Sequence, residues 1–232
     1  MYTTNSTTRL LGAAFLLQAV AAVVWTVLQD SLITTDDIVA SMTNIADNAM
    51  QMRASIVMTM VTGMAIIFLA SMLYLVLKTQ NGKIALVAFG LYLLEVAILA
   101  VSRIPAFSLI QISQESVIAG HPDYLQTLGN LAYEAAVFGD WLHMLPFAVG
   151  ALLFYTLFFR SRYIPRALSL FGLVAASLGL IGTLLVLLGY DVPVIVVALN
   201  FPFEVTVGVW LIVKGINYSS ETAQTIRGNG RS

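Results

Sequence analysis

The sequence predicts an all-α fold, a polytopic transmembrane bundle of six helices with both ends of the chain in the cytoplasm. Of the 232 residues, 59% are hydrophobic and only 10% are charged, whereas about a quarter of the residues in soluble domains are charged. Six apolar stretches also reach the length of about 20 residues that a helix needs to cross a bilayer. These stretches are 10–28, 54–77, 84–102, 141–159, 167–188 and 195–213.

The composition excludes several classes of function. The 11 basic and 12 acidic residues nearly balance, so the chain offers no cationic surface for nucleic acid. The lack of cysteine in the sequence excludes disulfides, thiolate metal sites and a cysteine nucleophile. No phosphate-binding glycine loop or haem pattern occurs, and we expect no cofactor. A chain with so few charged residues cannot cover itself with a polar surface, so we expect a lipid bilayer around most of it.

The first apolar stretch follows Arg9 and could be taken for a signal peptide. It is longer than such a segment, ends after Trp25 in polar residues, and is not followed by a small-x-small cleavage site. We therefore interpret it as the first transmembrane helix. A single domain is expected over 1–215, followed by a polar cytoplasmic tail over 216–232 that we expect to be disordered.

The basic residues predict which end of each helix faces the cytoplasm. Only Arg53 and Arg103 fall on one side of the predicted spans. The other nine fall on the opposite side, at Arg9, Lys78, Lys83, Arg160, Arg162, Arg166, Lys214, Arg227 and Arg231. Connections rich in lysine and arginine stay in the cytoplasm. Both termini are thus predicted to be cytoplasmic, in a multi-pass protein of the cytoplasmic membrane.

The long loops on the outer side are each expected to contain a helix. Thr34 followed by Asp37 has the form of a capping box, and the apolar residues after it predict an amphipathic helix on the outer interface. Those apolar residues are Ile38, Met42, Ile45, Ala49 and Met52. In the second loop, Pro105 is expected to end or kink the third span, and a helix is expected to start at Pro122 and run towards the fourth. Its apolar face would consist of Tyr124, Leu125, Leu128, Leu131, Ala132 and Ala135.

Small and aromatic residues in the spans have structural interpretations. The fifth span contains Gly172, Gly179, Gly182 and Gly189, and small residues on one face let helices approach closely. We interpret this face as packing inside the bundle, and a contact between two copies of the chain, giving a homo-oligomer, is the alternative. Trp25 and Tyr155 lie near predicted interfaces, as aromatic belt residues do.

Polar side chains within the spans are the candidate functional residues, because a charged group in lipid costs several kcal/mol unless it faces protein or water. They are Glu95, Arg103, Asp140, His143, Asn200 and Glu204. A rise of about 1.5 Å per residue places Glu95 roughly 18 Å and Glu204 roughly 15 Å from the inner ends of their helices. His143 then lies about 25 Å and Asp140 about 30 Å from the inner side, level with Arg103. This order predicts a polar cleft open to the outer face, if the third, fourth and sixth spans are neighbours.

Four interpretations of these residues remain open. They form a hydrogen-bonded network that fixes helix register, a cleft for a small ligand or ion, the site of a metal-dependent hydrolase, or part of an accessory subunit. For the hydrolase, Asp140 and His143 have the spacing of metal ligands. Glu95 or Glu204 would complete the site or act as general base, with Glu204 as the metal ligand of choice. As the leading function we choose the binding cleft. Its floor would be Glu95 and Glu204, its wall Asn200 and His143, and its rim Asp140 and Arg103.

Two stretches carry a resemblance to a known family. They are FFRSRYIPRALSLFGLVAASLGLIG, from Phe158 to Gly182, and FEVTVGVWLIVKGIN, from Phe203 to Asn217. Together with the opening Arg9-Leu-Leu-Gly12, they make nearly the whole chain resemble a bacterial membrane family known as domain of unknown function 4386. The resemblance implies a six-helix protein of the bacterial cytoplasmic membrane. It implies no activity, cofactor or catalytic residue.

Overall fold

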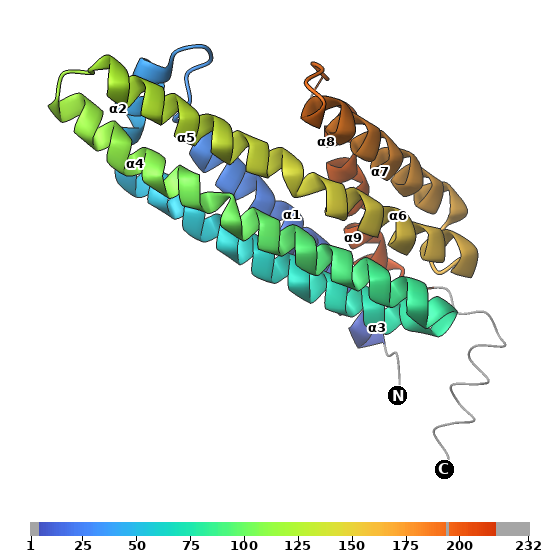
Figure 1. Ribbon diagram of the computed structural model, residues 1–232. Coiled ribbons are helices and arrows are strands. Elements are labelled where there is room, and N and C mark those ends of the chain that lie inside the picture. Colours follow the sequence, from blue (N-terminus) through green and yellow to red (C-terminus); the bar gives the residue numbers. More distant parts are fainter. Residues whose placement is uncertain (1–4, 194, 217–232) are drawn as a thin grey trace.

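The computed structural model describes residues 5–193 and 195–216, and every regular element within them is an α-helix. In order these are α1 (Asn5–Asp30), α2 (Ile38–Asp47), α3 (Ala49–Val101), α4 (Arg103–Ile118), α5 (Asp123–Leu142), α6 (Met144–Ser161), α7 (Arg166–Leu187), α8 (Ile195–Ala198) and α9 (Asn200–Val213). They form an elongated bundle, in which α2, α4 and the start of α5 project at one end (Figure 1). Most of the predicted tail, including Arg227 and Arg231, lies outside the described residues.

Helix α3 consists of two antiparallel arms that meet at Asn81 (Figure 1). The backbone there is extended, with φ −158° and ψ 101°. The side-chain oxygen of Asn81 accepts a hydrogen bond of 3.1 Å from the amide of Ile84, as the side chain of an N-cap residue does. Asn81 therefore starts the second arm, and the two arms contain the predicted second and third spans.

The third and fourth predicted spans continue outwards as α4 and α5. Helix α4 starts at Arg103, directly after Ser102, so the chain stays helical past Pro105. Proline is tolerated in a first turn because the amides there have no partner within the helix. The predicted start of the next helix is confirmed, because Pro122 is the N-cap of α5. Only His143 separates α5 from α6.

Several helices are long and apolar enough for a multi-pass membrane protein. Among the described residues, four helical stretches meet this condition: Ser6–Asp30, Ala49–Ile118, Asp123–Ser161 and Arg166–Leu187. The second of them contains the turn at Asn81 and therefore both arms of α3. The predicted sixth span is interrupted at Leu199, between α8 and α9. Helix α9 has 14 residues, fewer than the roughly 20 that cross a bilayer without tilt or thinning. The number of six crossings stays a prediction.

The start of α1 and the end of α9 lie at the same end of the bundle, as the predicted topology requires (Figure 1). The start of α1, the turn at Asn81, the α6–α7 connection and the end of α9 share one end of the bundle (Figure 1). A Cβ added at Gly215 would lie 3.9 Å from Thr8 Cγ2, and Gln80 Nε2 donates a hydrogen bond of 2.7 Å to the Tyr163 hydroxyl. That this end faces the cytoplasm stays a prediction from the basic residues.

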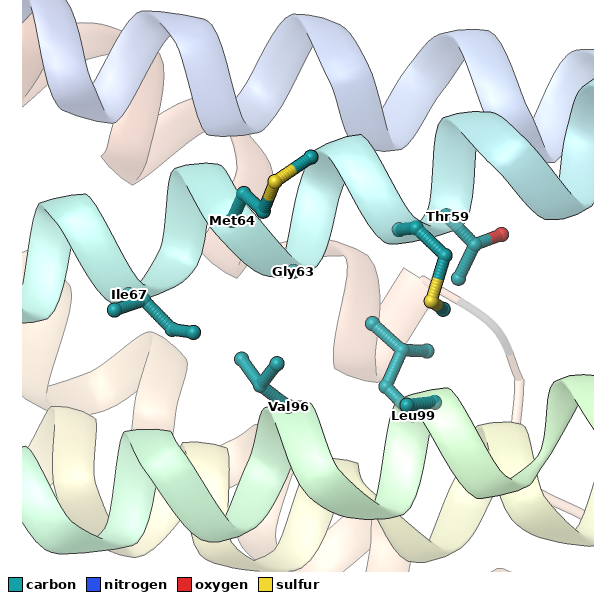
Figure 2. A pocket seen from close by; sticks show the side chains of 8 residues that line it. Thr59, Gly63, Met64, Ile67, Val96 and Leu99 are labelled. Carbon is teal, nitrogen blue, oxygen red and sulfur yellow. The ribbon is translucent and has the colours of Figure 1, made fainter.

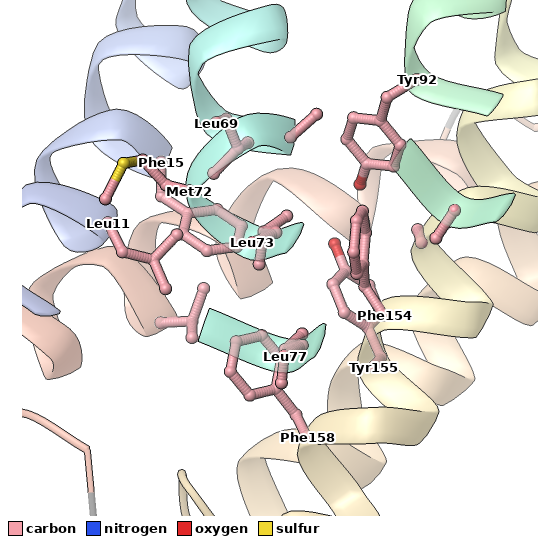
Figure 3. Close-up of a cluster of buried hydrophobic side chains, with 14 of the residues drawn as sticks. Leu11, Phe15, Leu69, Met72, Leu73, Leu77, Tyr92, Phe154, Tyr155 and Phe158 are labelled. Atoms are coloured by element: carbon pink, nitrogen blue, oxygen red, sulfur yellow. The ribbon is translucent and has the colours of Figure 1, made fainter. Parts of the chain in front are cut away.

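Buried apolar side chains form two separate clusters along the bundle. The main cluster joins α1, α3, α6 and α9 and includes Phe15, Leu73, Tyr92 and Phe154 (Figure 3). The distal cluster joins α2, α4, α5 and the first turn of α3, through Leu32, Met42, Ile45, Met52, Ala106, Leu109, Ile110 and Ala136. Between the clusters lies a polar layer of buried or half-buried residues: Gln29, Ser55, Thr59, Ser102, Arg103, Asp140 and His143.

Helix α2 is the predicted amphipathic helix, but it is shorter than predicted and has a different cap. It ends at Asp47, and Ala49 and Met52 belong to α3. Asp37 is the N-cap rather than Thr34, because its carboxylate accepts a hydrogen bond of 2.9 Å from the amide of Ala40. The apolar side of α2, with Met42 and Ile45, packs into the distal cluster against α4. The helix therefore belongs to the protein's own packing.

Helix α5 packs through small residues and leaves most of its predicted apolar face exposed. A Cβ on Gly139 would lie 2.2 Å from Ser102 Cβ, so only glycine allows this close approach. Leu125 of the predicted face is buried, whereas Tyr124 and Leu131 are 64% and 66% exposed. Exposed apolar side chains suit a helix that contacts lipid, because lipid tails are as apolar as leucine.

Candidate functional site

Arg103 is the centre of a buried polar cluster at the junction of α3 and α4. The side chain is 3% exposed and forms an ion pair with Asp140 of α5. Its Nη1 donates a hydrogen bond of 2.9 Å to Gln29 Oε1, and Nη2 donates one of 3.0 Å to Ser102 Oγ. The guanidinium carbon also lies 5.3 Å from the ring centre of Trp25, a cation–π contact. Arg103 thus links α1 and α5 to the α3–α4 junction.

Glu95 and His143 lie side by side, but without a hydrogen bond between them. His143 Nδ1 is 4.0 Å from Glu95 Oε1, and the two side chains are 12% and 4% exposed. His143 Nδ1 and the second carboxylate oxygen, Glu95 Oε2, have no hydrogen-bond partner among the described residues. A buried polar atom without a partner costs about 1–3 kcal/mol. The pair therefore has unused capacity to bind another group.

Two buried tyrosines lie near these carboxylates. Tyr92 of α3 and Tyr155 of α6 point their hydroxyls towards one another (Figure 3). The two hydroxyls interact with one another, and neither has a hydrogen bond to any other residue within the described part of the chain. Both lie in electrostatic range of Glu95 and Glu204. Tyr155 is fully buried, so its predicted role as an interface residue is wrong, and Tyr92 was not singled out from the sequence at all.

Glu204 reaches this region from α9. It is 5% exposed and within electrostatic range of Glu95. The preceding residue, Phe203, lies with its ring centre 4.5 Å from that of Tyr155 and so packs α9 against α6. A Cβ on Gly172 would lie 2.6 Å from the Phe203 ring, which shows how closely α7 approaches α9.

Asn200 holds the start of α9 against α7. Its Nδ2 donates a hydrogen bond of 3.4 Å to the main-chain oxygen of Ala175. A Cβ on Gly179 would lie 2.7 Å from the same nitrogen, so glycine makes room for the amide. Gly172 and Gly179 therefore pack inside the bundle, in line with the preferred interpretation of the fifth span.

The candidate residues form two groups, with His143 between them. Arg103 and Asp140 belong to the polar layer, whereas Glu95 and Glu204 lie deeper, beside the two tyrosines. We call the second set (Tyr92, Glu95, Tyr155 and Glu204) the inner oxygen cluster. The predicted third and fourth spans are in contact through α3 and α6. Helix α9 contacts α1 and α7 through the main chain and α6 through Phe203, and it is not a main-chain neighbour of α3 within the described residues. The most exposed of the six candidates is Asp140, at 20%, so the group occupies the interior of the bundle.

The donor set for the hydrolase interpretation does not converge. That interpretation requires His143 within a few ångströms of two carboxylates. The carboxylate next to His143 is Glu95, whereas Asp140 is paired with Arg103. No group of three or more histidine and carboxylate side chains suited to a metal ion occurs within the described ranges. The geometry therefore does not favour the hydrolase.

A separate cavity of about 280 Å³ lies between the two arms of α3 (Figure 2). It is lined by Thr59, Met60, Gly63, Met64, Ile67, Val96, Leu99 and Ala100. No charged residue contributes to this lining, and Met64 is 62% exposed on the outside of the bundle. The cavity thus borders the polar layer at Thr59, but none of the six candidate residues lines it.

Comparison with known proteins identifies the family. The family model described as Domain of unknown function (DUF4386) matches residues 10–215. The chain belongs to this family. The match covers the two stretches on which the resemblance rests, up to Gly215 of the second, so membership of the DUF4386 family is confirmed. Neither a curated protein nor a solved structure matches the chain. The family description names no activity, so any function must be argued from the side chains.

Proposed function

We propose that this protein binds a small polar ligand or ion inside the membrane, and that the ligand enters from the outer side. The binding groups are Glu95, Arg103, Asp140, His143, Asn200 and Glu204. The proposed setting is the bacterial cytoplasmic membrane, crossed six times, with both termini in the cytoplasm. On this proposal the ligand passes Asp140 and Arg103, which lie in the polar layer between the two apolar clusters, to reach the two glutamates at the inner end.

One observation carries this proposal: a buried oxygen of Glu95 and a buried nitrogen of His143 have no hydrogen-bond partner among the described residues. Glu95 Oε2 and His143 Nδ1 are buried without a hydrogen bond to any described residue. Buried polar groups in native proteins are nearly always paired, and exceptions require an explanation. A ligand that donates a hydrogen bond to the carboxylate, or carries a positive charge, would supply it.

The polar layer provides a contrast within the same chain. There Arg103 is paired with Asp140 and hydrogen-bonded to Gln29, as expected of a network that fixes helix positions. A purely structural role for Glu95 and His143 would predict the same degree of pairing. Their lack of it supports binding over structure.

The test is a thermal-shift screen of the full chain in mild detergent. Small polar compounds and salts are added singly to the wild-type protein and to the variants Glu95→Gln and His143→Ala. Glu134→Gln, at an exposed position of α5, is the control. We expect at least one compound to raise Tm in a saturable manner, with the effect lost in Glu95→Gln and retained in the control. A screen in which no compound distinguishes the wild type from Glu95→Gln contradicts the proposal.

A further inference from the structure

The two glutamates of the inner oxygen cluster have no lysine or arginine beside them. Within residues 5–193 and 195–216, the only ion pair made by a lysine or arginine is that of Arg103 with Asp140. Glu95 and Glu204 are 3% and 5% exposed, so water does not solvate them either. Carboxylates inside a membrane protein are stable when paired with a positive charge. A bound cation would balance these two carboxylates in their ionised form.

The tyrosine hydroxyls give the same region further oxygen ligands. Tyr92 and Tyr155 are 1% and 0% exposed, and their hydroxyls face and interact with one another (Figure 3). Neither hydroxyl has a hydrogen bond to any other described residue. Glu95 lies one helical turn from Tyr92 on α3, and Glu204 follows Phe203, whose ring packs against Tyr155. All four side chains are within electrostatic range of one another.

Packing holds the two tyrosine rings in fixed positions. The Tyr92 ring centre lies 5.5 Å from that of Phe154, and a Cβ on Gly150 would lie 2.8 Å from the Tyr92 ring. The Tyr155 ring packs against Phe203 at 4.5 Å. Ligands that are locked by their surroundings lose little freedom when they bind an ion.

The chemistry of these atoms selects the kind of ion. Carboxylate and hydroxyl oxygens suit the hard cations Na⁺, K⁺, Mg²⁺ and Ca²⁺, whereas Zn²⁺ and copper prefer nitrogen and sulfur ligands. We propose that Glu95, Glu204, Tyr92 and Tyr155 form a site for one hard cation in the interior of the bundle. This inference rests on the proposed function, names the class of its ligand, and adds the two tyrosines to the binding groups.

The test measures the thermal stability of the full chain against single cations. The protein is purified in mild detergent with chelator and N-methylglucamine as the only cation, and Na⁺, K⁺, Mg²⁺, Ca²⁺ or Zn²⁺ is added at constant ionic strength. We expect a hard cation to raise Tm by roughly 5–11 °C at a hundredfold excess over Kd. Tyr92→Phe and Tyr155→Phe keep the packed rings and remove one oxygen each. Each should weaken binding by about tenfold or more, while Tyr124→Phe, at a 64% exposed position, should not.

The outcomes separate this inference from the proposed function. A saturable shift with a hard cation, weakened in both tyrosine variants, supports the site. The inference is overturned if no hard cation shifts Tm, if Zn²⁺ alone does, or if both tyrosine variants bind as tightly as the wild type. If an uncharged compound stabilises the protein through Glu95 and no cation does, the cation site fails and the proposed function stands. If neither class of ligand acts, both fail.

Discussion

The contact between Arg103 and Asp140 should be a major source of stability, and Asp140→Ala tests this. The substitution would leave the guanidinium, which is 3% exposed, without its counter-charge. Breaking a buried ion pair costs about 3–5 kcal/mol because one charge stays buried and unpaired.

The geometry places the expected loss at the lower end of this range. Arg103 would keep its hydrogen bonds to Gln29 and Ser102 and its contact with Trp25, and Asp140 is itself 20% exposed. We therefore expect a loss of about 3 kcal/mol. For a chain of this size, about 2–4 °C per kcal/mol converts this loss to a fall in Tm of about 6–12 °C.

The assay is thermal unfolding in mild detergent, followed by tryptophan fluorescence, since Trp25 lies against the guanidinium. Glu134→Ala, an exposed change on the same helix, is the control and should shift Tm by no more than about 2 °C. The double variant Arg103→Met with Asp140→Leu should recover much of the loss, because it removes both charges. A fall below about 3 °C for Asp140→Ala, or a double variant less stable than the single one, would refute the reasoning.

Three further predictions concern packing, the inner carboxylates and topology. Gly12→Ala should lower stability by about 1–3 kcal/mol, because its Cβ would lie 2.6 Å from a main-chain oxygen of α9; an unchanged Tm would contradict this close crossing. Glu95→Gln combined with Glu204→Gln should leave Tm unchanged or higher in cation-free detergent, since it removes two unpaired carboxylates, and a fall of several degrees would instead favour a structural network. Because the chain lacks cysteine, Ala119→Cys should react with an impermeant maleimide in intact cells and Gly82→Cys only after permeabilisation. The reverse pattern would invert the topology.

Most of the helices can be predicted from the sequence, because apolar runs mark the segments that lie in lipid and basic residues mark the connections between them. The sequence does not predict helix α4. Pro105 suggested an end to the third span, yet a proline in the first turn of a new helix breaks no hydrogen bond. The cap of α2 was placed at Thr34 instead of Asp37 for a related reason, since both residues can cap and only the main chain decides between them.

The candidate site could be predicted only in part. The cost of charge in lipid singled out Glu95, Glu204, His143 and the rim residues, and residue counting gave their approximate depth. Tyr155 was interpreted as an interface residue because tyrosine is common at membrane interfaces, and Tyr92 was not singled out. Depth was the available signal for Tyr92, which lies about 13 Å beyond Lys83 along its helix. Pairing of Arg103 with Gln29 depends on how α1 packs, which residue spacing does not encode.

The division of the apolar interior into two clusters has a consequence for how the protein opens. The distal and main clusters share no side chain, and hydrogen bonds and an ion pair in the polar layer connect them. Units with separate apolar contacts can open independently, each with its own free energy. Amide protons of α2, α4 and the first half of α5 should then exchange with solvent as one set, while those of α6 and the central part of α3 stay protected. The contacts of Arg103 would then set the difference in opening free energy between the distal and main units. The projecting end would open and admit ions while the rest of the bundle remains intact.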